Sequence, residues 1–175
     1  MVRNRKAARL QGYDYSQNGA YFLTLCSKDK AYLFGRIVGA GVPDGPSVIL
    51  SPLGTIVRDR LDEMGRVYSD LHIAHYVIMP NHVHLLLVLD LPQGPSGTPA
   101  PTGGGQLNAR IPQFISTLKR MTNKTAGRDL WQRSYHDHII RSDEDFAEHW
   151  TYIDGNAARW TEDEYYTPDP NPQNI

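Results

Sequence analysis

Residues 71–90 read "LHIAHYVIMPNHVHLLLVLD", two apolar runs separated by Pro80 and Asn81. Short aliphatic runs of this length are typical of strands, and a Pro-Asn pair between them is typical of a turn. The stretch therefore predicts a β-hairpin. Side chains two positions apart on a strand project from the same face, so His82 and His84 of the second run should lie side by side.

Further strands and helices flank this hairpin. The alternating segments "AYFLTLCS" (20–27) and "WQRSYHDHIIRS" (131–142) each predict a strand. Ser51 followed by Pro52 is typical of a helix N-terminus, and Ser142 before three acidic residues is another. A further helix is predicted over residues 107–127, where apolar residues recur at helical spacing. The order strand, helix, hairpin, helix, strand, helix predicts an α+β fold, with a ferredoxin-like antiparallel sheet and helices packed on one face.

Length and composition are those of a globular protein. At 175 residues the chain fits one domain (residues 1–175), with 40% hydrophobic and 21% charged residues. We expect a flexible Pro/Gly-rich loop over residues 90–106 and an acidic, proline-rich tail over residues 161–175. The single cysteine, Cys26, cannot form an internal disulfide, and we find neither a signal peptide nor a bilayer-spanning run. We therefore expect a cytoplasmic protein without a membrane partner.

The net charge of −1 conceals an uneven distribution of basic residues. One cluster precedes the first strand and another lies on the helix predicted over residues 107–127; the members are Arg3, Arg5, Lys6 and Arg9, and Lys119, Arg120 and Lys124. Basic clusters bind nucleic-acid phosphates, so these residues are candidate DNA contacts. Each cluster taken alone is also compatible with an ordinary solvated surface.

The paired imidazoles of His82 and His84 are candidate ligands of a divalent ion. Two ligands seldom hold an ion by themselves, so a third oxygen or nitrogen ligand should come from elsewhere in the chain. A His-x-His pattern on a strand is more often structural, however, and His136 and His138 repeat the spacing on another predicted strand. The spacing alone leaves either pair as the metal pair.

The last predicted helix supplies groups that a two-histidine site lacks. Tyr152 and Asn156 are four residues apart and share a helix face, with Glu148 one turn earlier. The amide oxygen of Asn156 can complete a metal site, and the Tyr152 hydroxyl can then attack a phosphate held there. The alternative for Tyr152 is a packed aromatic side chain without a chemical role.

Three separated segments, "MPNHVHLLL" (79–87), "WQRSYHDHIIRSDEDF" (131–146) and "HWTYIDGNAARW" (149–160), together resemble the single-tyrosine HUH insertion-sequence transposases. The resemblance is closest to the REP-associated tyrosine transposase branch. It implies that His82 and His84 are the two histidines of the HUH motif, and that Asn156 completes a site for Mg²⁺ or Mn²⁺. It also implies that Tyr152 is the catalytic nucleophile, on a C-terminal helix. Family members often carry Pro after this Asn, where the present chain has Ala157.

The same resemblance implies an activity. Such an enzyme cleaves and rejoins single-stranded DNA next to hairpins, as in REP-like repeats, through a 5′-phosphotyrosine intermediate, and it works as a monomer or as a homodimer. Two alternatives are a domesticated, non-catalytic DNA-hairpin-binding protein and an HUH replication initiator or relaxase. A histidine-triad nucleotide hydrolase is excluded, because Leu86 stands where its further histidine is required.

Two kinds of residue are less well defined by the sequence. The general base that activates the tyrosine is not identified, and Glu148 and a metal-bound water are the two candidates. Candidate residues for stacking on DNA bases are Trp131, Tyr135 and His136, although core packing is as good an interpretation for Trp131.

Overall fold

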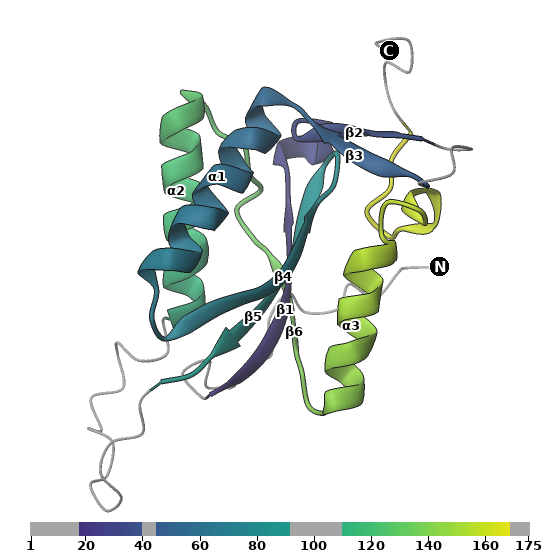
Figure 1. The fold of residues 1–175 in the computed structure, drawn as a ribbon. Coiled ribbons are helices and arrows are strands. Elements are labelled where there is room, and N and C mark those ends of the chain that lie inside the picture. The colour runs from purple at the N-terminus through teal and green to yellow at the C-terminus, as the bar shows by residue number, and fades with distance from the viewer. Residues whose placement is uncertain (1–17, 40–44, 92–109, 169–175) are drawn as a thin grey trace, which may run out of the picture.

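The computed structural model describes residues 18–39, 45–91 and 110–168 (Figure 1). The predicted DNA contacts Arg3, Arg5, Lys6 and Arg9 lie outside the described residues. Of the predicted flexible loop only residues 90 and 91 are described, and of the predicted tail only residues 161–168. Within the described part of the chain, no helix is long and apolar enough to cross a membrane.

One four-stranded antiparallel sheet forms the centre of the fold. Its strands are β1 (Gly19–Cys26), β4 (Leu71–Ile78), β5 (His82–Leu89) and β6 (His136–Ile139). They lie in the order β4-β5-β1-β6, with every neighbouring pair antiparallel. Strands β1 and β4, which are connected through a helix, hold β5 between them, and this is the split βαβ arrangement of a ferredoxin-like sheet. The predicted α+β class and antiparallel sheet are therefore confirmed.

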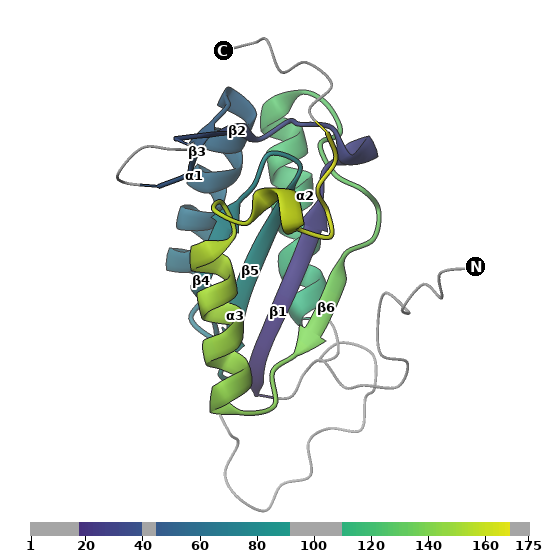
Figure 2. The same ribbon diagram turned by 90° about the vertical axis from the view of Figure 1, so that its right-hand side faces the viewer.

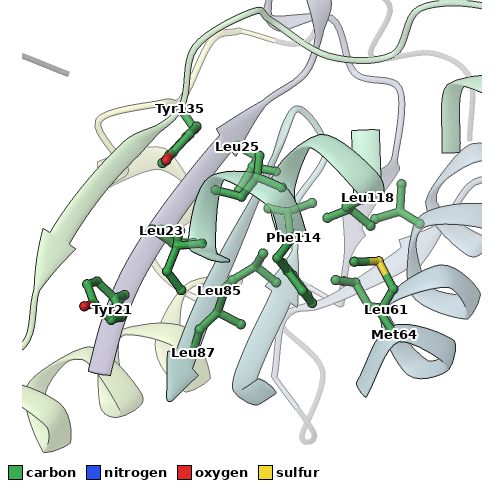
Figure 3. Close-up of a cluster of buried hydrophobic side chains, with 14 of the residues drawn as sticks. Tyr21, Leu23, Leu25, Leu61, Met64, Leu85, Leu87, Phe114, Leu118 and Tyr135 are labelled. Carbon is green, nitrogen blue, oxygen red and sulfur yellow. The ribbon is translucent and has the colours of Figure 1, made fainter. Parts of the chain in front are cut away.

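Helices α1 (Pro52–Val67) and α2 (Arg110–Ala126) pack together on one face of this sheet (Figures 1 and 2). As predicted, Ser51 caps α1, and its Oγ accepts a hydrogen bond from the Gly54 N–H at 3.1 Å. Figure 3 shows the buried side chains between the two helices and the sheet, which include Tyr21, Leu23, Leu25, Leu61, Met64, Leu85, Leu87, Phe114 and Leu118. Full burial of one such aliphatic side chain contributes about 1.5–3 kcal/mol, so this layer is the main hydrophobic core.

Helix α3 (Asp143–Gly155) lies on the opposite face of the sheet (Figure 2). It begins after the predicted cap Ser142, whose Oγ accepts a hydrogen bond from the Asp145 N–H at 3.2 Å. The expectation that the helices pack on one face thus holds for α1 and α2 but not for α3. The reason lies in β5, whose residues 82–87 are all buried, with alternate side chains facing α1 and α2 on one side and α3 on the other.

Smaller elements complete the described part. Strands β2 (Gly35–Val38) and β3 (Ser47–Leu50), which come between β1 and α1 in the sequence, form a separate antiparallel ribbon. Two 3₁₀ turns, η1 (Lys28–Lys30) and η3 (Trp160–Glu162), follow β1 and α3 respectively. The chain after η3 returns to the beginning of β5, where it meets the two histidines.

Candidate active site

The two histidines of "HVH" lie at the first and third positions of β5. His82 is paired with Cys26 of β1 and His84 with Thr24. Both imidazoles lie on the same face of β5, and the contact of His84 with Tyr152 shows that this is the face that α3 covers. Both side chains are enclosed, with His82 0% and His84 1% exposed. Their rings are inclined at 67°, and the two Nε2 atoms are 3.0 Å apart. Two ring nitrogens therefore meet at one point inside the protein.

Asn81 determines which nitrogen of His82 carries the proton. The Asn81 Nδ2 group donates to the Tyr165 carbonyl at 3.0 Å, which leaves the amide oxygen Oδ1 facing His82 Nδ1 at 2.9 Å. An amide oxygen only accepts, so the imidazole must carry its proton on Nδ1. The lone pair of His82 is then on Nε2, where a metal ligand needs it.

Thr24 bonds to the second imidazole but does not fix its tautomer. Its hydroxyl lies 2.8 Å from His84 Nδ1. Because His82 Nε2 is an acceptor, His84 Nε2 donates to it in the absence of an ion, and Thr24 donates to Nδ1. A hydroxyl can also accept, so Thr24 equally supports the other tautomer, in which both Nε2 lone pairs are free for a metal.

Helix α3 places Tyr152 and Asn156 beside the histidines. Tyr152 lies in the last turn and Asn156 is the C-cap residue, and the Tyr152 ring packs edge-on against His84 at 5.2 Å. Both side chains bond to one atom, Asp163 Oδ2: the Tyr152 hydroxyl donates to it at 2.7 Å and the Asn156 amide at 2.9 Å. The structure thus brings together all four residues predicted for catalysis and metal binding.

Asp163 is the residue of the site that the sequence analysis missed. Its Oδ2 lies 3.7 Å from His84 Nε2 and 3.9 Å from His82 Nε2, and its side chain is 1% exposed. It belongs to residues 161–175, which we expected to form an acidic tail. One aspartate among several acidic residues carries no distinguishing spacing, so only its contacts reveal its position.

Residues 163–167 form a cover over the histidines. The Tyr165 ring lies 5.0 Å from the His82 ring, and the Tyr165 carbonyl accepts from Asn81. The Tyr32 hydroxyl donates to the Thr167 carbonyl. These contacts bury the ligand atoms and hold Asp163 against them.

Burial dominates the protonation of the site. It lowers the pKa of His82 well below the ordinary value and lowers that of His84, so both imidazoles are neutral at neutral pH. Burial alone would raise the pKa of Asp163, but interactions with the two histidines and Tyr152 outweigh it and lower the pKa. Burial and the neighbouring carboxylate raise the pKa of Tyr152. The site therefore combines two neutral imidazoles, one carboxylate and a protonated phenol.

The donor set fits a divalent ion. His82, His84 and Asp163 offer two ring nitrogens and a carboxylate oxygen that lie within 4.8 Å of one another. Asn156 Oδ1 is buried without a hydrogen-bond partner among the described residues, which is unusual for an amide oxygen and suits a metal ligand. Carboxylate and amide oxygens suit Mg²⁺ and Mn²⁺, and imidazole nitrogens suit several divalent metals. The predicted ligands, with Asp163 added, are thus chemically suited to the predicted ion.

The predicted DNA contacts on α2 lie away from this site, since α2 is on the other face of the sheet (Figure 2). The Lys119 ammonium donates to the carbonyls of Gln132 at 2.7 Å and Ser134 at 3.0 Å, so it stabilises the segment before β6. Arg120 and Lys124 are exposed. Their contact with DNA stays a prediction.

Two cations that the sequence analysis did not single out lie closer to the site. The Arg159 guanidinium is 5.9 Å from the Tyr152 ring, and Lys30 Nζ is 5.6 Å from the Tyr165 ring. The candidate base Glu148 is exposed, and the Tyr152 hydroxyl bonds to Asp163 instead.

The other candidate residues of the sequence analysis have different surroundings. His138 on β6 bonds to Asp145 of α3 at 2.9 Å, so the second His-x-His pair does not meet Tyr152. Trp131 and Tyr135 are buried in the main core, which leaves His136 as the exposed member of the predicted stacking residues. The pair on β5 is therefore the one that α3 completes.

Comparisons with known proteins show what the chain resembles in sequence and in fold. No protein-family model matches the chain. An uncharacterized protein of Haemophilus influenzae is 29% identical over 178 residues, covering 94% of this chain and 94% of that protein. A candidate REP-associated tyrosine transposase of the same organism is 24% identical over 155 residues, covering 83% of this chain and 74% of the relative.

A solved structure shows the same fold. It is that of a REP-associated tyrosine transposase bound to a REP hairpin, with a TM-score of 0.57 and 17% sequence identity, and the match covers 91% of this chain and 76% of that one. The resemblance predicted from the three sequence segments is confirmed: this chain is similar in sequence to a candidate REP-associated tyrosine transposase and has the fold of a solved one.

Proposed function

We propose that the protein is a transposase that cleaves and rejoins single-stranded DNA next to hairpins, with Tyr152 as the nucleophile. One observation carries the proposal: an anionic oxygen, Asp163 Oδ2, lies 2.7 Å from the Tyr152 hydroxyl and 3.7 Å from His84 Nε2. A scissile phosphate needs the same position for one of its oxygens, between the nucleophile and the metal ligands. His82, His84, Asn156 and Asp163 would hold the Mg²⁺ or Mn²⁺ ion.

Cleavage forms a bond between the Tyr152 oxygen and phosphorus and breaks the bond from phosphorus to the 3′ oxygen. The products are a 5′-phosphotyrosine and a free 3′-hydroxyl, and the 3′-hydroxyl gains the proton that the phenol loses. Attack by another 3′-hydroxyl reverses both bond changes and releases Tyr152, so rejoining needs no external energy source. When bound, the divalent ion would polarise the non-bridging oxygens of the phosphate.

Asp163 is well placed to receive the Tyr152 proton, because it already accepts a hydrogen bond from that hydroxyl. The raised pKa of Tyr152 means that the phenolate needs help to form. Arg159 lies 5.9 Å from the Tyr152 ring and would favour the negative charge. These two residues replace Glu148 as our candidates for activating the nucleophile.

Substrate entry requires a change in the cover formed by residues 163–167. In the described structure, the side chains of His82, His84, Asn156 and Asp163 are all enclosed. A phosphate can reach the Tyr152 hydroxyl only if residues 163–167 shift enough to admit it while Asp163 stays within hydrogen-bonding distance of that hydroxyl. The bonds from Asn81 to Tyr165 and from Tyr32 to Thr167 are then the contacts that must loosen.

The partner is inferred by similarity to the solved transposase, which is bound to a REP hairpin. Lys30 and Arg159 are the cations that lie near the cover and the nucleophile and suit the flanking phosphates. The basic residues predicted from the sequence would contact the hairpin at a greater distance from the scissile phosphate. They are Arg3, Arg5, Lys6, Arg9, Lys119, Arg120 and Lys124.

A second candidate function is a hairpin-binding protein that does not cleave. The enclosure of the histidines and the bond from Tyr152 to Asp163 favour it, since both keep the nucleophile from a phosphate in this conformation. It shares the DNA partner with the first proposal but not the chemistry. The test therefore has to score binding and cleavage separately.

The experiment uses end-labelled single-stranded hairpin oligonucleotides taken from the sequence that flanks the gene. They are incubated with the protein and MnCl₂ or MgCl₂, and a protein–DNA adduct that resists SDS is sought. We expect an adduct that disappears in Tyr152→Phe and with EDTA but persists in Tyr76→Phe, which alters a tyrosine on β4 whose hydroxyl donates to Asp62 of α1. Hairpin binding without adduct, with every oligonucleotide and both ions, would instead establish the non-catalytic binder.

A further inference from the structure

Helix α3 carries Tyr152 but has little apolar attachment to the sheet. Of its 13 residues only Ile153 is buried. The side chains that share the stripe with the nucleophile recur at helical spacing and are polar: Asp145, His149, Tyr152 and the C-cap Asn156. The position of Tyr152 therefore depends on polar and aromatic contacts along this stripe.

A cluster of two histidines and an aspartate ties the first half of α3 to β6. His138 Nε2 donates to the Asp145 carboxylate, at 2.9 Å from Oδ2 and 3.0 Å from Oδ1. His149 Nδ1 donates to the Asp145 carbonyl at 2.8 Å and lies 3.1 Å from Oδ1. Asp145 Oδ2 also accepts from the Arg141 N–H at 3.0 Å. One carboxylate thus joins the edge strand, the segment before α3 and the helix itself.

Aromatic contacts extend this attachment to the nucleophile. The His149 ring stacks on His138 at 4.6 Å and packs against Phe22 of β1 at 4.5 Å. Phe22 in turn contacts Tyr152 at 5.9 Å and stacks on His84 at 5.0 Å. A continuous line of rings leads from β6 to the nucleophile and to one of the metal ligands.

The same cluster does not have the geometry of a second metal site. An imidazole binds a metal through a lone pair in the plane of its ring, so two rings that share an ion must have planes that meet at the ion. The His138 and His149 rings are inclined at only 17° with their centroids 4.6 Å apart, so their planes do not meet near either nitrogen. The cluster is therefore an internal hydrogen-bonded attachment.

We propose that His138, Asp145 and His149 are positioning residues, which fix α3 on the sheet and thereby hold the Tyr152 hydroxyl at the phosphate. The catalytic consequence rests on the proposed function, whereas the attachment of α3 does not. Displacement of a nucleophile by about 1 Å can slow a reaction on the order of 100-fold. Loss of His138 should therefore slow the chemical step and leave binding of DNA and metal unchanged.

The test compares His138→Ala with His138→Gln in the full chain. Glutamine places an amide N–H near the position of Nε2, so it can restore the bond to Asp145. His72→Ala, which alters an exposed histidine on β4, is the matched control. Three quantities are measured: the adduct-forming rate with saturating hairpin oligonucleotide and MnCl₂, the Kd of the same oligonucleotide, and hydrogen exchange of the α3 amides.

We expect His138→Ala to lower the rate on the order of 10- to 100-fold at unchanged Kd, and to speed exchange in the first two turns of α3. His138→Gln should recover most of the rate and the protection, and His72→Ala should change neither. Unchanged exchange and rate in His138→Ala would overturn the inference, and so would a raised Kd at an unchanged rate. If the wild type forms no adduct, the proposed function fails, and exchange in the two His138 variants still decides whether the cluster fixes α3.

Discussion

The described part of the chain contains two clusters of the same composition, two histidines and one aspartate, and they differ in almost every physical respect. In the first, His82, His84 and Asp163 are enclosed, and the two rings are inclined at 67° with their Nε2 atoms facing each other. In the second, the side chains of His138, Asp145 and His149 are 48%, 20% and 21% exposed, and the rings are nearly parallel. Proximity of ligand types therefore does not by itself give the ring orientation that a shared metal ion requires.

The hydrogen-bond partners of the ring nitrogens also differ between the two clusters. Asn81 and Thr24 hold the Nδ1 atoms of His82 and His84, so that both Nε2 atoms can face an ion. In the second cluster, the ring nitrogens facing Asp145 are already satisfied by hydrogen bonds to it. In a metal site, each histidine makes its hydrogen bond through one ring nitrogen and leaves the other nitrogen for the ion. In the second cluster, the nitrogens that could bind an ion make the hydrogen bonds instead.

The largest expected contrast is in metal binding by matched His→Ala variants of the two clusters. An ion at about 100 times its Kd stabilises a protein by about 2.7 kcal/mol, so Mn²⁺ should raise the Tm of the wild type. We expect His84→Ala to abolish this rise and His138→Ala to retain it, with each variant compared with its own metal-free Tm. Equal losses in both variants, measured by thermal unfolding with and without EDTA, would contradict the distinction between the clusters.

A smaller effect on metal affinity is expected from removing a group that bonds to the second ring nitrogen of a ligand histidine. Thr24→Val keeps the shape of a buried strand residue but removes the hydroxyl that supports His84 Nδ1. Loss of such a supporting group typically costs about 10- to 100-fold in metal affinity. Calorimetric titration with MnCl₂ should show this loss in Thr24→Val but not in Thr125→Val, which alters an exposed threonine on α2. Unchanged affinity in Thr24→Val would show that the Thr24 hydroxyl does not support His84 as a metal ligand.

The smallest expected effect is on acid stability. The pKa values of Asp163 and Asp145 are both lowered: burial would raise each of them, but hydrogen bonds and charge interactions with the neighbouring histidines outweigh it. A lowered carboxyl pKa adds stability that is present above the ordinary value of 3.8 and is lost as pH falls through the lowered value. The fall in Tm between about pH 5 and pH 2 should therefore be reduced in Asp163→Asn and less so in the more exposed Asp145→Asn. A greater reduction in Asp145→Asn than in Asp163→Asn would contradict the expectation that the enclosed carboxylate contributes more to acid stability.

Most of the architecture could be predicted because it depends on local patterns. The caps Ser51 and Ser142 and the hairpin around Pro80 and Asn81 are each marked by a few neighbouring residues, and all occur as predicted. The layer in which α3 lies could not be predicted in the same way. Both faces of β5 are buried, so its aliphatic pattern does not say which helix covers which face.

The sequence by itself determined the order of the four sheet strands and three helices, the shared face of His82 and His84, and the spacing of Tyr152 and Asn156. Strand and helix periods are local and require no knowledge of distant contacts. Only the tertiary structure decided that the histidines of β5, and not those of β6, meet Tyr152 and Asn156 at the end of α3. It also decided that Asp163, from a segment expected to be a tail, completes the site. These outcomes depend on which surfaces pack together and on the ring orientations that packing imposes, and neither is encoded in the spacing of residues along the chain.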